Sequence, residues 1–208
     1  MSDPNVATAG RVRPVKLSRV RALTVTAMFS AIAFVLMFLD FSVPLIPSFV
    51  KMDVSELPAL LAAFGLGPVY GVMVCLVKNL IHLLITSTGG AGELCNFLLG
   101  TFFVLPAGIL YQKMKSRKGA IIGSLIGAVV MGLLSIPLNY YITYPVYSNF
   151  MPIDLIIGMY QSIRPSVNGL LECLIIFNAP FTLVKGLLVT ALCFLIYKPL
   201  SPLIHGRR

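Results

Sequence analysis

The chain alternates between long apolar runs and short polar segments that carry most of its charges. A helix needs about 20 predominantly apolar residues to cross a bilayer, and several runs reach or approach that length. Together the runs predict an all-α integral membrane domain over residues 22–198. Its expected transmembrane helices are at about 22–39, 54–65, 68–87, 93–112, 119–141 and 173–197.

The apolar stretch at 54–88 is too long for one helix and is interrupted by Gly65-Leu66-Gly67-Pro68. Helices rarely continue through a glycine and proline cluster of this kind. We therefore divide the stretch into a short helix at 54–65 and a second helix that begins at 68. The short helix cannot span a bilayer alone, so its ends are expected in a cavity or against other helices.

Two basic clusters, at 11–21 and 113–118, test this division. Lysine and arginine are enriched in cytoplasmic segments, so the chain between the clusters must cross the membrane an even number of times. The division gives four crossings there, whereas an undivided helix would give three. The full prediction is six transmembrane helices, a basic tail at 1–21, a second tail at 199–208, and both termini in the cytoplasm.

Composition supports the membrane class. Hydrophobic residues make up 58% of the chain and charged residues 11%, whereas soluble domains carry about 25% charged residues. The net charge of +9 does not indicate a nucleic-acid partner, because the basic residues flank apolar runs as topology signals. The chain lacks a P-loop and other catalytic motifs, and His82 and His205 have no carboxylate or cysteine at ligand spacing. We expect no enzyme activity and no metal.

Lys185 lies in the middle of the last expected helix, where a charge is costly unless it faces a cavity or a partner. It either pairs with a buried carboxylate or reaches the interface, or it donates a hydrogen bond to a ligand. Thr182 and Asn178 lie three and seven residues earlier, on the same helical face. These three residues form a polar stripe that predicts a ligand-binding surface.

Glu93 and Asn96 lie in the first turn of another expected helix, after a glycine-rich segment that would let a ligand approach the backbone. Helix capping explains Glu93 equally well, because carboxylates favour helix N-termini. Asn139, near the outer end of its helix, is a weaker candidate for ligand binding.

Two other features suggest contacts rather than chemistry. Ala27 and Ala31 are four residues apart, and small residues at that spacing allow helices to approach closely, within the bundle or against another subunit. The charged segment 51–58 lies on the outer side by the count of crossings. Its charges either pair locally or cap a cavity that opens outward.

Several stretches, in matching order over about 22–198, resemble the substrate-binding S components of energy-coupling factor (ECF) vitamin transporters. The riboflavin-specific S components are the most similar. The matching stretches are KMDVSELP (51–58), GLGPVYGV (65–72), VKN (77–79), GELCNFLLG (92–100), SRKG (116–119) and NAPFTLVKG (178–186).

The resemblance implies a six-helix bundle in the bacterial plasma membrane that binds riboflavin in its outer half, with flavin mononucleotide as a further candidate ligand and no cofactor. A membrane-embedded coupling protein and two ABC-type ATPase subunits would supply the energy, which accounts for the missing P-loop. Ala27 and Ala31 match the small-residue motif that contacts the coupling protein in this family.

The resemblance also assigns ligand-binding roles. Lys185 and Asn139 match a ligand-binding lysine and asparagine, and Glu93 and Asn96 fall at a matching helix start. Thr182 stands where the resemblance implies an asparagine, and Asn178 is a candidate to replace the missing amide. An S component for another vitamin is the main alternative, and a membrane scaffold or a small membrane enzyme is a lesser one.

Overall fold

The computed structural model describes residues 19–44, 46–47, 50–86 and 89–205, with side chains described as far as Ile196. Five long helices form most of the structure: α1 (Arg19–Met37), α3 (Pro68–His82), α4 (Ala91–Met114), α5 (Arg117–Leu138) and α9 (Ala179–His205). A shorter helix, α2 (Glu56–Gly65), precedes α3. The remaining elements are β1 (Phe41–Ser42), β2 (Lys51–Met52), η1 (Leu83–Ile85), η2 (Asn139–Thr143), α6 (Tyr144–Tyr147), α7 (Ile153–Gln161), α8 (Leu170–Cys173) and η3 (Leu174–Asn178).

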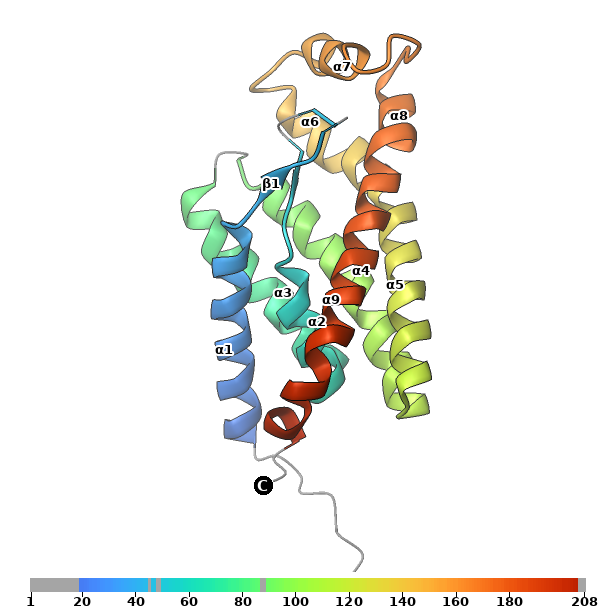
Figure 1. Ribbon diagram of the computed structural model, residues 1–208. Coiled ribbons are helices and arrows are strands. Elements are labelled where there is room, and N and C mark those ends of the chain that lie inside the picture. The colour runs from blue at the N-terminus through green and yellow to red at the C-terminus, as the bar shows by residue number, and fades with distance from the viewer. Residues whose placement is uncertain (1–18, 45, 48–49, 87–88, 206–208) are drawn as a thin grey trace, which may run out of the picture.

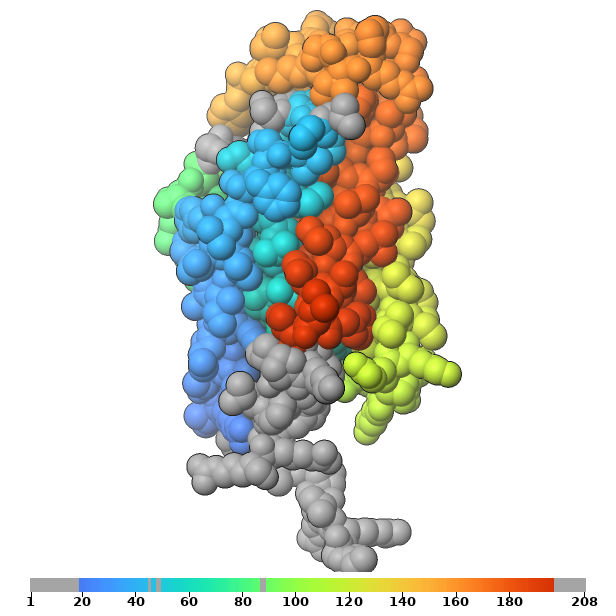
Figure 2. Space-filling view, in the orientation of Figure 1, coloured from blue at the N-terminus to red at the C-terminus, as the bar shows by residue number. Residues whose placement is uncertain are grey.

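The long helices run side by side in an elongated bundle (Figure 1). α4 packs against α3 and α5, α5 packs against α9, and α1 packs against α2 and α3. The start of α1, the turn between α4 and α5, and the end of α9 lie at one end, which we call the basic end. The short antiparallel pair β1–β2, α6 and α7 lie at the other, the α7 end. The segment around α7 covers that end (Figure 2).

α2 occupies the middle of the bundle and contacts α1, α3, α4 and α9. Most of its residues are buried, and Ala59, Leu60 and Ala62 have no exposed surface. A helix that is apolar all round is stable only when other elements surround it. The sequence at 56–65 therefore specifies an internal helix that is shielded from lipid by its neighbours.

Local chemistry explains the two tight turns at the basic end. Gly67 adopts a φ of 124°, which side-chain-bearing residues rarely reach, and Pro68 follows it at the first position of α3. At the next turn, the Ser116 side chain accepts a hydrogen bond from the Gly119 amide and caps α5. Both turns reverse the chain within a few residues, so the helices they join pack against each other.

Among the described residues, five helical stretches are long and apolar enough to cross a membrane, which confirms the all-α membrane class. They are Arg19–Met37, Pro68–Ile85, Ala91–Met114, Arg117–Tyr147 and Leu170–Ile196. α2 has 10 residues, or about 15 Å of helix against a hydrocarbon core of about 30 Å. It does not span a bilayer by its own length.

The structure differs from the expected boundaries at several points. The helix expected to end at 141 continues to Tyr147. The prolines and charges at 142–172 predict an outer loop with short amphipathic pieces, and α7 is a helix within that segment. Arg19–Arg21 and residues 199–205 are helical rather than parts of tails. The rest of the expected tails, 1–18 and 206–208, lies outside the described residues.

Close packing of α4 on α5 depends on Gly127, because a Cβ atom there would overlap the backbone carbonyl of Phe103. We expect Gly127→Ala to destabilise the protein by about 1–3 kcal/mol, the usual effect of overpacking. Thermal unfolding in detergent measures this. Gly158→Ala in α7 is the matched control, since an added Cβ there meets no atom within 4 Å. Equal melting temperatures for the two variants would contradict the role given to Gly127.

Candidate functional site

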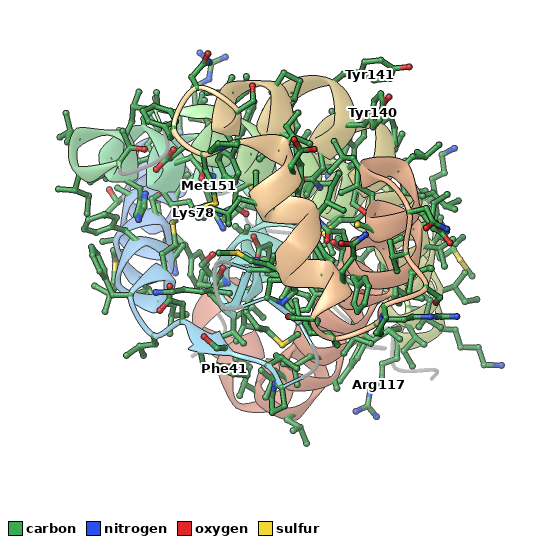
Figure 3. All side chains as sticks on the ribbon, turned by 90° about the horizontal axis from the view of Figure 1, so that it is seen from above. Phe41, Lys78, Arg117, Tyr140, Tyr141 and Met151 are labelled. Carbon is green, nitrogen blue, oxygen red and sulfur yellow. The ribbon has the colours of Figure 1, made fainter. Side chains whose placement is uncertain are left out.

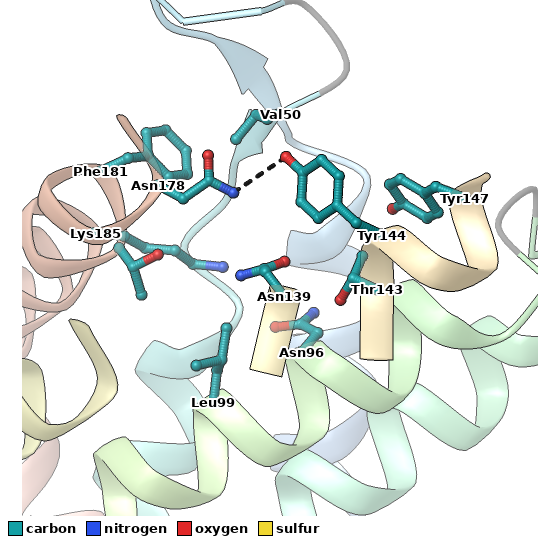
Figure 4. A pocket seen from close by; sticks show the side chains of 11 residues that line it. Val50, Asn96, Leu99, Asn139, Thr143, Tyr144, Tyr147, Asn178, Phe181 and Lys185 are labelled. Carbon is teal, nitrogen blue, oxygen red and sulfur yellow. Dashed lines mark hydrogen bonds between the residues drawn. The ribbon is translucent and has the colours of Figure 1, made fainter. Parts of the chain in front are cut away.

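A cavity of about 150 Å³ lies toward the α7 end of the bundle (Figure 4). α4 contributes Asn96 and Leu99 to its wall, and Val50 approaches from the segment before β2. The other lining residues come from η2 and α6, which continue α5, and from η3 and the start of α9; they are Asn139, Thr143, Tyr144, Tyr147, Asn178, Phe181, Thr182 and Lys185. Amides, hydroxyls and one ammonium group thus face a space that is otherwise closed by apolar side chains.

Two π-helical turns shape this wall. In η2 the Tyr144 amide donates to the Asn139 carbonyl, and in η3 the Ala179 amide donates to the Leu174 carbonyl. Each turn ends directly before a proline, at Tyr144-Pro145 and Ala179-Pro180. Proline has no amide proton and its ring crowds the preceding turn, so the helix widens there. Widened turns of this kind are frequent at functional sites.

The widened turns place polar groups on the cavity. Asn139 and Thr143 stand at the two ends of η2, and Asn178 stands at the end of η3. The Asn139 side chain also donates to the Ser135 carbonyl at 2.7 Å, which holds its amide in place.

Lys185 belongs to a chain of four buried charges beside the cavity. Its Nζ lies 2.9 Å from Asp53 Oδ2 and 3.1 Å from Glu56 Oε2, and Lys78 Nζ lies 2.9 Å from Glu56 Oε1. Lys78 also donates to the Ser55 hydroxyl. The side chains of Lys78 and Glu56 are 0% and 2% exposed. Two cations and two anions balance, so the cluster carries no net charge inside the bundle.

Asp53, which precedes α2, has two hydrogen-bond donors. The Lys185 ammonium group donates to its Oδ2 at 2.9 Å, and the Ser55 backbone amide donates to its Oδ1 at 2.8 Å. These bonds fix the carboxylate between α9 and the start of α2.

A family model described as the substrate-specific component of ECF transporters matches residues 21–197. The chain belongs to this family. It is therefore an S component, a part of a transporter rather than an enzyme or a membrane scaffold.

Relatives of this S component cover almost its whole length. The riboflavin transporter RibU of Staphylococcus aureus (strain TCH60) is 34% identical, over 91% of this chain and 95% of the relative. The riboflavin transporter FmnP of Bacillus subtilis (strain 168) is 35% identical, over 91% of this chain and 97% of the relative. A solved structure of the S component of a bacterial ECF transporter superposes with a TM-score of 0.72 at 34% identity, covering 92% of this chain and 100% of that one.

Five of the six residues proposed from the sequence as ligand-binding line this one cavity; they are Asn96, Asn139, Asn178, Thr182 and Lys185. Of the two interpretations that the position of Lys185 allowed, the structure shows the pairing with buried carboxylates, and donation to a ligand stays a prediction. Its ammonium group is paired with buried carboxylates, and its side chain also forms part of the cavity wall, directed toward Asn139 in Figure 4.

Glu93 is not among the residues that line this cavity. Its Oε1 lies 2.8 Å from His82 Nδ1, and its side chain faces a separate apolar groove between α3 and α4. His82 therefore has a carboxylate partner in the fold, although Glu93 is 11 residues away in the sequence. The pair connects the end of α3 to the start of α4.

Ala27 and Ala31 are both exposed on α1, on the side that faces away from the bundle. The buried residues of this helix are instead Ala22, Thr26, Phe29, Ser30 and Ala33. Within the part of the chain that the structure describes, these two alanines are therefore not packed inside the bundle. The small-residue face is accessible to lipid or to another subunit.

Lys78 was not predicted as a functional residue, although it carries the same signal as Lys185. It is a lysine within an apolar helical run, and such a residue requires a partner. The partners of Asp53 and Glu56 were also left undecided by the sequence. Their partners lie on α3 and α9, far away in sequence, so neither charge pairs only within its own segment.

Removing Lys78 should strongly destabilise the protein, because Glu56 would remain buried with fewer countercharges. We expect Lys78→Met to lower the free energy of unfolding by about 3–5 kcal/mol. The double variant Lys78→Met, Glu56→Gln should recover much of that loss, because Lys185 then retains Asp53 as its partner. Thermal unfolding of the purified variants gives both values.

Lys51→Met is the matched control for Lys78→Met. It breaks the Lys51–Asp40 pair, whose side chains are 52% and 32% exposed, and should cost less than about 1 kcal/mol. A Lys78→Met variant as stable as this control would show that the buried cluster does not hold the bundle together.

Proposed function

We propose that this S component binds riboflavin from outside the cell and delivers it inward as the substrate-specific subunit of an ATP-driven ECF transporter. The observation that carries the proposal is the convergence of Asn96, Asn139, Asn178, Thr182 and Lys185 on one cavity with apolar walls. The relatives named as riboflavin transporters support it independently.

The chemistry of the cavity suits a flavin. The isoalloxazine ring is flat and largely apolar, and its carbonyl and N–H groups lie on one edge. Phe181, Leu99 and Val50 supply apolar contact, while Lys185 donates and the amides of Asn96 and Asn139 can donate or accept. Thr182 offers a hydroxyl, and Asn178 supplies an amide four residues before it.

The cavity is smaller than most sites for ligands of this size. Its volume is about 150 Å³, whereas such sites usually enclose about 300–1,000 Å³. In this proposal the lining segments separate to admit riboflavin. Flavin mononucleotide, which adds a phosphate to the ribityl tail, is a second ligand in this proposal if that tail reaches the solvent.

The proposed topology has six crossings with both termini in the cytoplasm. The second crossing combines α2 with the chain that leads into it from β2. Gly67, just beyond α2, lies against the side chain of Gln112 near the end of α4, so this crossing reaches the level at which α4 ends. Arg19, Arg21 and the cluster at 113–118 all lie at the basic end, which the positive-inside rule assigns to the cytoplasm.

The coupling protein is proposed to contact the exposed face of α1 at Ala27 and Ala31. Small side chains let two helices approach until their backbones nearly touch, and this gives close packing within a membrane. Two ABC-type ATPase subunits would drive the assembly, because this chain has no nucleotide-binding motif of its own.

A titration of detergent-purified protein with riboflavin, followed by quenching of flavin fluorescence, should show saturable binding near one to one. Lys185→Met should weaken binding by about 10- to 100-fold, since it removes a charged donor. Asn139→Leu, which leaves the ion pairs intact, should weaken it by about 5- to 10-fold. Lys118→Met, at the basic end, is the control. A folded wild-type protein that does not quench riboflavin would refute the proposal.

Large side chains on the exposed face of α1 should separate transport from binding. We expect Ala27→Trp, Ala31→Trp to abolish riboflavin uptake by cells while the purified variant still binds riboflavin normally. Val129→Trp, Leu133→Trp on α5 is the matched control, because these residues are also four apart and are 49% and 64% exposed. Unchanged uptake in the α1 variant would place the partner contact elsewhere.

A further inference from the structure

Three buried polar side chains from separate elements meet at the roof of the cavity. Tyr144 of α6 and Tyr160 of α7 have their hydroxyl oxygens 2.6 Å apart, and the Tyr160 hydroxyl donates to Asn178 Oδ1 at 2.8 Å. Asn178 Nδ2 in turn donates to the Tyr144 hydroxyl at 3.4 Å, the dashed line of Figure 4. Tyr144 and Asn178 line the cavity, whereas Tyr160, which is 0% exposed, stands behind them.

The protons of this ring can be assigned from its geometry. Asn178 Oδ1 can only accept, so Tyr160 uses its single proton there, and Tyr144 must donate the proton of the 2.6 Å bond to Tyr160. Exchanging the oxygen and nitrogen of the amide reverses the direction of the ring. Even then Tyr144 donates within the ring, to the amide oxygen.

The ring therefore fixes what each group offers to the cavity. The Tyr144 hydroxyl has no second proton, so it can face a ligand only as an acceptor. Asn178 uses one N–H bond within the ring and keeps the other as a donor. Lys185, one helical turn beyond Thr182 on the same wall, is a further donor.

We propose that Tyr160 is a positioning residue that makes Tyr144 an acceptor and Asn178 a donor, so that the site selects a ligand edge carrying an N–H beside a carbonyl. The inference rests on the proposed function and deepens it. The imide edge of a flavin has this pattern, with one N–H between two carbonyl groups. Methylation of the imide nitrogen removes that N–H and leaves both carbonyls.

α7 is held firmly enough for this role. Ile156 and Tyr160 are its buried residues, and they pack in one apolar cluster with Tyr144, Val167 and Phe177. At its end, the Gln161 side chain donates to the Val167 carbonyl at 2.8 Å and connects the helix to the segment before α8. The α7 end seen from above shows this helix crossing over the middle of the bundle (Figure 3).

The test compares the dissociation constants of riboflavin and 3-methylriboflavin for each variant. Wild-type protein should prefer riboflavin by at least about tenfold, because methylation leaves the Tyr144 oxygen without its donor. Tyr144→Phe should reduce that preference to near one. Tyr160→Phe removes no atom from the cavity wall, yet it should reduce the preference for riboflavin several-fold. Without the Tyr160 hydroxyl as its acceptor, Tyr144 can turn its proton toward a ligand carbonyl.

Tyr141→Phe is the matched control, since this tyrosine lies on η2 at the rim of the bundle and is 74% exposed (Figure 3). The preference of this variant for riboflavin over 3-methylriboflavin should equal that of the wild type. An unchanged preference in Tyr160→Phe would overturn the positioning role, and an unchanged preference in Tyr144→Phe would show that the ring meets no ligand N–H. Failure of wild-type protein to bind riboflavin at all would instead refute the proposed function, and this inference with it.

Discussion

Two lysines and two carboxylates meet where α2 begins, and the arrangement of the bundle depends on their pairing. Each charge alone would cost several kcal/mol in an apolar interior, whereas the four together are neutral and lie within 3.1 Å of their partners. Asp53 and Glu56 belong to the chain that enters α2, Lys78 to α3 and Lys185 to α9. The pairs therefore fix one internal helix against two others.

The position of this cluster also determines the cavity. Lys185 is a cluster member and a wall residue, so the end of its side chain is fixed before any ligand arrives. Elsewhere on the wall, the two π-helical turns place Asn139 and Asn178. The ion pair constrains the end of the Lys185 side chain, and the π-helical turns constrain the backbone at Asn139 and Asn178. The placement of these polar groups therefore does not depend on a ligand.

The sequence predicts the parts of this fold that depend on local composition. Long apolar runs identify the spanning helices, and isolated polar residues within them identify five of the residues that line the cavity. Contacts between distant segments are not accessible in this way: Glu56 pairs with Lys78 across a turn and Glu93 pairs with His82 across another. The two prolines after the π-helical turns were visible, but how far a helix widens depends on its packing.

α7 was predicted only as one of several short amphipathic pieces in the outer loop at 142–172. It is short, and Pro152 and Pro165 on either side give its surroundings the composition of a loop. Only two of its residues are buried, yet one of them, Tyr160, completes the hydrogen-bonded ring at the roof. A buried tyrosine hydroxyl needs a partner, and here the partners are themselves wall residues. A segment that contributes nothing to the wall itself can thus influence which ligands the wall accepts.

One set of residues holds the bundle together, and another set lines the cavity or supports its wall. The separation of these two sets explains how one fold can serve different ligands. The charge cluster and α2 hold the bundle, and their residues are buried against other helices rather than selected by what fills the cavity. Thr182 belongs to the set that lines the cavity. A hydroxyl there, in place of the expected amide, alters the wall without disturbing the ion pair of Lys185 one turn away. Specificity can therefore change through a few wall residues and those behind them, while the framework that positions them stays the same.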